Sequence, residues 1–378
     1  MDAEFIPKPA GPSAAAGVAE AVAGDVRQLV GPARSVDTAL IDAATRGWSA
    51  NTQRAFRSDL ALWADWCGRQ GITAAAASPS DVTRWLRQLG GTEPSGERPR
   101  TMATIERYLV HIGWAYRIAG LADPTAAPLV KLEKKALRKA LGVRQRQARA
   151  IRFKGDIADL DSPAHGVCLA HLIKACRRDL LGLRDEALLR VAYDSAARRS
   201  ELVAILVDHI EGPDESGAGT LFVPRSKTDQ AGEGAYAYLA PATLRAIARW
   251  RGAARIERGP LFRRVEVHFD GSVAAVGSEA LHPGSISLIY RRLIRAAHAK
   301  KLLGAMGEAE LERWVKAVSS HSIRVGVAQD NFAADESLPA IMQAYRWRDP
   351  KTVLRYGARL AAKSGASARM AARLAGEK

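Results

Sequence analysis

The chain has 378 residues, of which 47% are hydrophobic and 25% charged, a balance typical of a folded protein rather than a disordered one. At about 100–200 residues per domain, this length predicts two or three domains. No apolar run reaches the roughly 18–20 residues of a membrane span, and the early acidic residues argue against a secretory signal. Three cysteines without a Cys-x-x-Cys pair disfavour a disulfide framework, so we expect a reducing, cytoplasmic setting.

Positive charge is concentrated in one part of the chain. The formal net charge is +16, and residues 131–154 alone hold ten Lys or Arg against a single acidic residue, Glu133. Localised charge of this size usually binds a polyanion, and nucleic acid is the first candidate. The alternative is a basic protein without such a partner.

The first 45 residues are rich in Ala, Gly and Pro and hold few large apolar residues. This composition predicts a flexible N-terminal arm, residues 1–45, with at most a short helix. It ends where large aromatic residues begin.

Residues 46–141 have the pattern of a helical domain. Phe56, Leu60, Trp63 and Cys67 recur at steps of four, three and four, which predicts one buried helix face that ends near Gly71. Further helices are predicted from a capped start at Ser78, Pro79 and Asp81, from Thr101 to Gly120, and from Pro124 or Pro128 to Leu141.

A basic linker is predicted next, at residues 142–152, because this stretch is polar and lacks an apolar period. A second domain then occupies residues 153–378. It begins with helices, shows one β signal at 219–239 around the turn residues Gly232 and Gly234, and returns to helices.

One cluster of potential metal ligands is a poor site. His165, Cys168, His171 and Cys176 lie on a stretch predicted to be helical, which places the outer two about 16 Å apart at 1.5 Å per residue. Zinc ligands must converge on one ion. We predict no metal site here, and because the sequence lacks nucleotide-binding motifs we predict no cofactor.

Two short motifs place an arginine three residues from a second polar side chain. Arg198 and Glu201 share one face if the segment is helical, and so do His321 and Arg324. Each pair alone also fits an ordinary ion pair or polar contact on a helix surface. A third candidate, Lys227, lies in the predicted hairpin turn, where a single lysine usually has no special role.

The fourth motif combines two aromatic residues. Trp347 and Tyr356 are nine residues apart, with a break at Asp349–Pro350 between them. Alone, these aromatic residues also fit simple packing.

The order of the four motifs resembles the tyrosine site-specific recombinase (phage integrase) family, and within it the Cre-type recombinases. The family's first box, Leu/Ala-Arg-x-x-Glu-Leu, reads here Ala197-Arg198-Arg199-Ser200-Glu201-Leu202; its His-x-x-Arg box reads His321-Ser322-Ile323-Arg324; and its His or Trp nine residues before the nucleophilic Tyr is Trp347 before Tyr356. The resemblance covers about residues 48–378. It departs from the family in the arm 1–45, in a long hairpin loop at 225–234, and between Tyr290 and His321.

This resemblance implies a mainly α fold with a small antiparallel β-sheet, in which a helical N-terminal domain and an α+β catalytic domain form a two-domain clamp on DNA. It implies a nucleoid-associated enzyme in bacteria that cleaves and rejoins DNA through a 3′-phosphotyrosine, without ATP or metal, and that assembles as a homotetramer through a C-terminal docking helix within 359–375. The partner is double-stranded DNA with a specific recombination site. The catalytic residues implied are Arg198, Lys227, His321, Arg324, Trp347 and Tyr356, with Glu201 supporting them.

The implied roles suit the residue types. Two guanidinium groups can grip the phosphate oxygens in a bidentate manner, and an indole N–H adds a fixed donor. The phenol of Tyr356 attacks, His321 accepts or orients its proton, and Lys227 is the general acid for the departing oxygen. Candidate DNA contacts outside the catalytic set are Arg54, Arg57, Arg84 and Arg87 in the first domain, Arg144, Arg146 and Arg149 in the linker, and Ser285, Ser287 and Arg291 in the second domain.

Three alternatives remain at this stage. A type IB topoisomerase uses similar residues but relaxes DNA without pairing two sites. A catalytically silent accessory protein would keep the fold and DNA binding, although the complete residue set disfavours it. A basic RNA-binding protein would form no covalent adduct with DNA.

Overall fold

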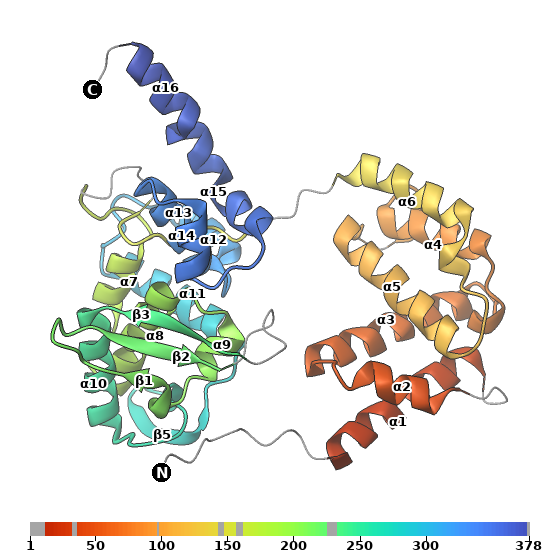
Figure 1. The fold of residues 1–378 in the computed structure, drawn as a ribbon, viewed down its shortest axis with the longest axis horizontal. Coiled ribbons are helices and arrows are strands. Elements are labelled where there is room, and N and C mark those ends of the chain that lie inside the picture. Colours follow the sequence, from red (N-terminus) through yellow and green to blue (C-terminus); the bar gives the residue numbers. More distant parts are fainter. Residues whose placement is uncertain are drawn as a thin grey trace. The chain divides into compact units, whose positions relative to one another are not determined.

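The structure, a computed structural model, describes residues 12–31, 36–96, 98–142, 147–155, 162–224 and 233–375. Contacts divide the chain into two compact units, Met1–Arg146 and Gln147–Lys378 (Figure 1). The division falls inside the stretch predicted as a linker. Among the described residues, no helix is long and apolar enough to cross a membrane.

The first unit is built from helices in its described part. They are α1 (Pro12–Val30), α2 (Thr38–Thr45), α3 (Ala50–Arg69), α4 (Pro79–Gly90), α5 (Met102–Ile118) and α6 (Pro128–Leu141), with 3-10 turns at Ala74–Ala76 and Pro124–Ala126. Local signals in the sequence explain these bounds. The Ser78 hydroxyl accepts from the Asp81 N–H while the Asp81 carboxylate accepts from the Ser78 N–H, and Gly91 (φ 74°) ends α4 in the left-handed region. The predicted helices of residues 46–141 are thus confirmed.

The expectation of a flexible arm over residues 1–45 is wrong for the residues described there. Helices α1 and α2 pack into the first unit, where Val22, Val26 and Ile41 are fully buried in the same cluster as Phe56 of α3. The segment has few large apolar residues, but they lie on one face of each helix, and one face is enough to dock a helix.

The second unit combines helices with two small sheets. Its helices are α7 (Leu169–Ala175), α8 (Leu180–Ser195), α9 (Arg199–Val203), α10 (Pro241–Ala254), α11 (Ser285–Ala299), α12 (Glu308–Ala317), α13 (Ser322–Ala333), α14 (Leu338–Ala344), α15 (Pro350–Ser364) and α16 (Ala366–Leu374), with a 3-10 turn at Val207–His209. Strands β1 (Ile210–Glu211), β2 (Gly219–Val223) and β3 (Ala235–Leu239) form an antiparallel sheet in the order β1-β2-β3. This mainly α fold with a small antiparallel sheet is the predicted one.

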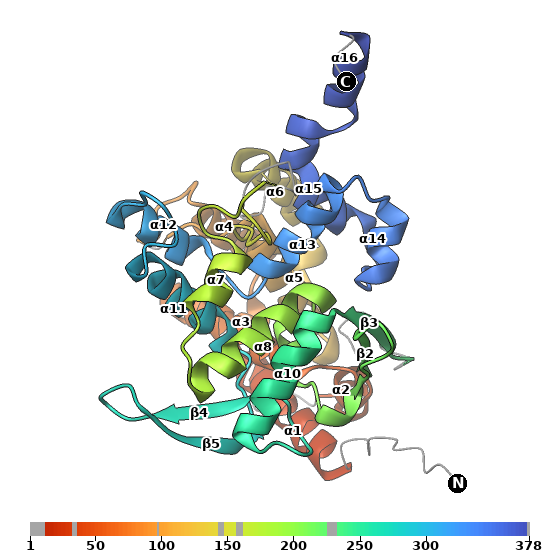
Figure 2. The same ribbon diagram turned by 90° about the vertical axis from the view of Figure 1, so that its left-hand side faces the viewer.

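A second hairpin, of β4 (Arg263–Val267) and β5 (Val273–Ala280), is absent from the sequence-based prediction. Figure 2 shows it extending from the edge of the second unit. Its strands lack the alternation of apolar and polar residues that marks a packed strand, because Val265 is buried but most of its neighbours are exposed.

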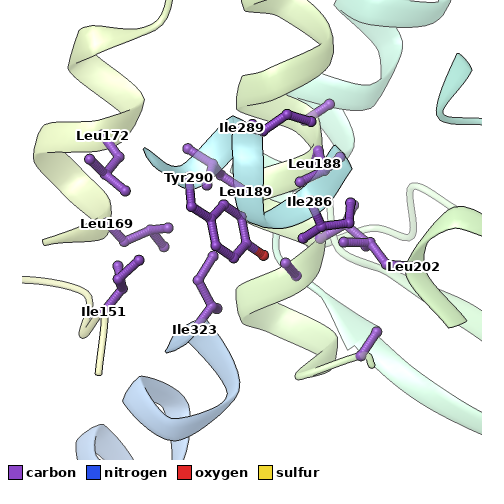
Figure 3. Packing of buried hydrophobic residues seen from close by; sticks show 14 of the residues in the cluster. Ile151, Leu169, Leu172, Leu188, Leu189, Leu202, Ile286, Ile289, Tyr290 and Ile323 are labelled. Carbon is purple, nitrogen blue, oxygen red and sulfur yellow. The ribbon is translucent and has the colours of Figure 1, made fainter. Parts of the chain in front are cut away.

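The core of the second unit anchors the helices that carry the motifs singled out in the sequence. Figure 3 shows Tyr290 of α11 packed among side chains of α7, α8 and α13, with Ile323 and Leu202 in the same cluster. Ile323 is the neighbour of Arg324, and Leu202 is the neighbour of Glu201. Burial of these two apolar residues therefore fixes where the adjoining polar side chains stand.

The end of the predicted linker is part of this unit rather than a free connection. The Ile151 N–H donates to the Ser322 carbonyl (2.9 Å), and Arg152 Nε donates to Asp330 Oδ1 (2.6 Å), with Ile151 and Arg152 both buried. Gly326 of α13 faces this strand-like segment so closely that a Cβ there would overlap the backbone of Ile151. Glycine at 326 is what lets the segment lie against α13.

Candidate active site

Arg198 and Glu201 form a buried pair at the junction of α8 and α9. Arg198 is the residue before α9, and its Nη1 donates to Glu201 Oε1 at 2.6 Å while its backbone N–H donates to Oε2 at 3.0 Å. Glu201 is 4% exposed and Arg198 20% exposed, so this is not the solvated surface pair that the spacing alone also allows. The carboxylate holds both the backbone and the fork of Arg198 in one orientation.

Arg324 lies in the first turn of α13, and its side chain is buried. Its Nη1 donates to the carbonyl of Ala196, just beyond the end of α8. Burial, and the nearby positive charge of Arg198, lower the pKa of Arg324 to about 10. The two predicted arginines are thus close enough for the charge of one to disfavour that of the other, and an anion beside them would offset this repulsion.

Trp347 lies between α14 and α15, with its indole ring under the guanidinium of Arg324, whose central carbon is 4.7 Å from the ring centroid. The ring is buried, and its Nε1 has no hydrogen-bond partner. An unsatisfied buried donor is costly unless a ligand completes it. The indole N–H is therefore a candidate contact for a phosphate oxygen.

Tyr356 stands in α15, with its ring centroid 6.3 Å from that of Trp347 in an edge-on arrangement. Helix α15 is tied to α13 at this point, because Gln329 Nε2 donates to the Tyr356 carbonyl (3.0 Å) and Gly357 lies against the Phe332 ring. The Tyr356 side chain is half-buried, which leaves its phenol within reach of a substrate. Arg198, Arg324, Trp347 and Tyr356 therefore gather in one place.

His321 and Lys227 are the remaining two predicted catalytic residues. His321 is the residue immediately before α13, and its side chain is exposed, whereas that of Arg324 in the first turn of α13 is buried. Lys227 lies outside the described residues. The long loop at 225–234 that separates β2 from β3 falls mostly outside them as well.

Arg346 belongs to the same site, although sequence reasoning did not select it. Its Nη2 donates to the Ser195 carbonyl at 3.0 Å and lies 3.9 Å from Glu201 Oε2. Burial lowers its pKa, and Nη1 is buried without a partner. The available signal was an arginine directly before Trp347, which is weak because its contact with Ser195 spans 151 residues of sequence.

The predicted DNA contacts outside the catalytic set are mostly exposed, but several have partners within the protein. Arg57 pairs with Asp25 (2.7 Å), Arg84 with Asp81 (2.9 Å), and Arg87 with Glu133 (3.0 Å). Those in the second unit are partly buried or exposed: Arg149 over the Trp314 ring, and Ser285, Ser287 and Arg291 on α11. Arg54 is exposed and bonds Asn51, while Arg144 and Arg146 lie outside the described residues.

The side chains considered and rejected as zinc ligands do not converge. His171 is buried, with Nδ1 2.9 Å from the Gly166 carbonyl, and Cys168 is buried so that its pKa is raised. Within the described ranges, no group of three or more His, Cys, Asp or Glu side chains is placed to hold a metal ion.

The structure thus combines a helical unit with an α+β unit in which arginine, tryptophan and tyrosine side chains lie close together. No family model matches the chain. Two curated relatives do: the chain is 27% identical over 314 residues to an integrase/recombinase XerD homologue of Selenomonas ruminantium (81% of each chain), and 27% identical over 331 residues to recombinase Cre of Escherichia phage P1 (86% of this chain, 89% of that one).

Solved structures share the fold at low identity. The XerH site-specific recombinase in a post-cleavage complex with a palindromic difH substrate matches with a TM-score of 0.54 at 10% identity, over 96% of this chain and 98% of that one. The Tn1549 transposon integrase with transposon right end DNA matches with a TM-score of 0.52 at 11% identity, over 90% and 98%. Over most of its length the chain is therefore similar to integrases and site-specific recombinases.

Proposed function

We propose that this protein is a site-specific DNA recombinase that breaks and rejoins strands through a 3′-phosphotyrosine at Tyr356. The observation that carries the proposal is the convergence of Arg324, Trp347 and Tyr356 in one cluster, with Arg198 close enough to lower the pKa of Arg324. Repelling guanidinium groups beside a half-buried phenol suit an anionic substrate attacked by oxygen.

The binding of the scissile phosphate falls to the cationic side chains. Arg198 and Arg324 direct N–H groups at its non-bridging oxygens, and the unpaired Trp347 Nε1–H donates a further bond. As the transition state gathers charge on those oxygens, these fixed donors stabilise it more than the ground state.

In the cleavage step, Tyr356 Oη bonds to phosphorus and the bond to the 5′ oxygen breaks. His321 accepts or orients the phenolic proton, and Lys227 gives a proton to the departing 5′ oxygen, so that a 5′-hydroxyl leaves. Rejoining runs the same step in reverse with a 5′-hydroxyl from another strand. The phosphotyrosine keeps the energy of the broken bond, so that religation needs no ATP.

The basic segment 131–154 supplies non-specific affinity for the DNA backbone. Lys131, Lys135 and Lys139 are exposed and recur every four residues along one face of α6. Such a row suits a line of phosphates and predicts strong salt dependence of binding. Reading of bases falls to Ser285, Ser287 and Arg291 on α11, together with first-unit arginines.

A tetramer on two DNA sites is part of the proposal. Helix α16 carries Met370 (55% exposed) and Leu374 (82% exposed), apolar side chains that a second copy of the chain can cover. A chain that ends at Ser364 should cleave a single site but fail to pair two sites in an electrophoretic synapsis assay. Normal synapsis by the shortened chain would remove α16 from this role.

The central experiment traps the protein on DNA. In a library of nicked duplexes, the short strand beside the nick diffuses away after cleavage, so that a covalent adduct should accumulate. Sequencing the DNA strand attached to the protein then identifies the target site. Tyr356→Phe should form no adduct yet keep DNA affinity within about threefold, because one hydroxyl contributes little to binding by many charges. An adduct formed by Tyr356→Phe would contradict the proposed nucleophile.

A further inference from the structure

The backbone of Arg346 adopts an unfavourable conformation. Its φ is +57°, in the left-handed region that residues with a Cβ rarely adopt, and its side chain is 11% exposed. A buried arginine in such a conformation persists only where its surroundings hold it there. The contacts of the side chain show what holds it.

Arg346 connects the turn before Trp347 to the end of α8. Its Nη2 donates to the Ser195 carbonyl at 3.0 Å, and Arg324 donates to the next carbonyl, that of Ala196. Carbonyl groups at a helix C-terminus carry partial negative charge, so two guanidinium groups share this one helix end. The same Nη2 lies 3.9 Å from Glu201 Oε2, and Glu201 accepts from the Arg198 backbone through Oε2 and from its side chain through Oε1.

The charges of this cluster do not balance. Within the described part of the chain, Glu201 is the carboxylate that lies within 4.0 Å of Arg198 or Arg346. Three guanidinium groups therefore share one counter-charge, and burial, together with the nearby charge of Arg198, lowers the pKa of Arg324 and of Arg346. Arg346 Nη1 is also buried without a partner. Such an excess of positive charge favours an incoming anion.

We propose that Arg346 is a positioning residue for the scissile phosphate: it fixes the Glu201–Arg198 pair against the end of α8 and adds a third positive charge to the field that the phosphate meets. This role rests on the proposed function. It extends the catalytic set implied by the sequence, in which two arginines carry the phosphate charge.

The backbone conformation supplies a test that separates charge from structure. Arg346→Gly removes the guanidinium but relieves the strain at φ +57°, so this variant should melt no lower than Arg346→Ala. Arg255 is a matched control because it is exposed, ends α10 and has φ +52°. Arg255→Gly makes the same exchange away from the site and should cleave at the wild-type rate.

The measurement is single-turnover cleavage, with saturating protein, of the duplex recovered by covalent trapping. Arg346→Gly should cleave it at least about tenfold more slowly than the wild type and Arg255→Gly, and Arg346→Lys should recover part of the loss. A second duplex carries a methylphosphonate at the scissile position, which removes one negative charge. On it, the gap between Arg346→Gly and the wild type should narrow to about threefold or less, because less charge remains to be stabilised.

Two results would overturn the role of Arg346. Equal cleavage of the phosphodiester by Arg346→Gly and Arg255→Gly would show that the guanidinium is dispensable. An equal loss by Arg346→Gly on both duplexes would show a structural effect unrelated to phosphate charge. A wild-type chain that forms no adduct with any duplex would instead contradict the proposed function, and with it the reaction that Arg346 is proposed to support.

Discussion

The guanidinium of Arg324 lies over the indole of Trp347, 4.7 Å from the ring centroid, and the indole Nε1–H has no partner. The two faces of this contact serve different purposes. The ring surface stabilises a buried cation through the π electrons, whereas the ring edge presents a free donor. A phosphate that accepts from both residues would sit where guanidinium and indole edge meet.

Trp347→Phe should separate these purposes. Phenylalanine keeps an aromatic face for Arg324 but has no N–H, and because Nε1 is unpaired in the free protein, no internal hydrogen bond is lost. We expect single-turnover cleavage to fall about 10- to 100-fold, the size of one hydrogen bond to a charged group at 1.5–3 kcal/mol. Cleavage at the wild-type rate would exclude the indole N–H as a phosphate contact. Trp347→Ala serves as the control that loses both face and donor.

Arg198→Lys tests the fork geometry. Lysine keeps the positive charge but cannot form the proposed bidentate contact with the phosphate. It also cannot reproduce the geometry of the hydrogen bond from Arg198 Nη1 to Glu201 Oε1 at 2.6 Å. Cleavage should fall at least about 100-fold while DNA affinity changes little. Arg199→Lys is the matched control, because Arg199 is the exposed neighbour and should tolerate the change. Near-normal cleavage by Arg198→Lys would contradict the proposed clamp.

Lys227→Ala tests the proposed general acid. A duplex with sulfur in place of the 5′ bridging oxygen has a leaving group that needs no proton, so it should restore cleavage by Lys227→Ala to near the wild-type rate on the same duplex. On the ordinary duplex the variant should be slow. If sulfur gives no recovery, another group supplies the proton.

Gly326→Ala tests how the segment at Ile151 supports α13. A Cβ at 326 would overlap the Ile151 backbone, so this change should lower the free energy of unfolding by at least about 1–3 kcal/mol and also slow cleavage through displacement of Arg324. Gly252→Ala in α10 is the control, because no atom lies within 4 Å of its would-be Cβ. It should stabilise the protein by about 0.5–1 kcal/mol in urea unfolding. A stable, active Gly326→Ala would show that the segment can move aside.

Much of the fold and of the candidate site can be predicted from the sequence, for physical reasons that differ between the helices and the site residues. The ends of helices such as α4 can be predicted from local residues: Ser78 and Asp81 cap its start, and Gly91 ends it. The motifs of the proposed active site can be recognised in the sequence because the spacing within each motif is set by a single turn or helix. Burial of Glu201 and the convergence on Trp347, by contrast, depend on packing between segments far apart in the chain.

The misses have the same origin. Helix α1 was hidden by its small residues, since Val22 and Val26 suffice for docking only when α3 offers a matching face. The hairpin of β4 and β5 packs too little of its surface to leave an alternating pattern. Arg346 acquires its place from a contact with Ser195, which no local pattern encodes.

The bond from Gln329 to the Tyr356 carbonyl has a consequence for stoichiometry. It joins the backbone of Tyr356 in α15 to α13, the helix that bears Arg324, within one polypeptide. We therefore predict that two defective copies, one with Tyr356→Phe and the other without Arg324, do not restore cleavage to each other when they are mixed. The cleavage rate of a mixed assembly should then be proportional to the number of intact polypeptides that it contains.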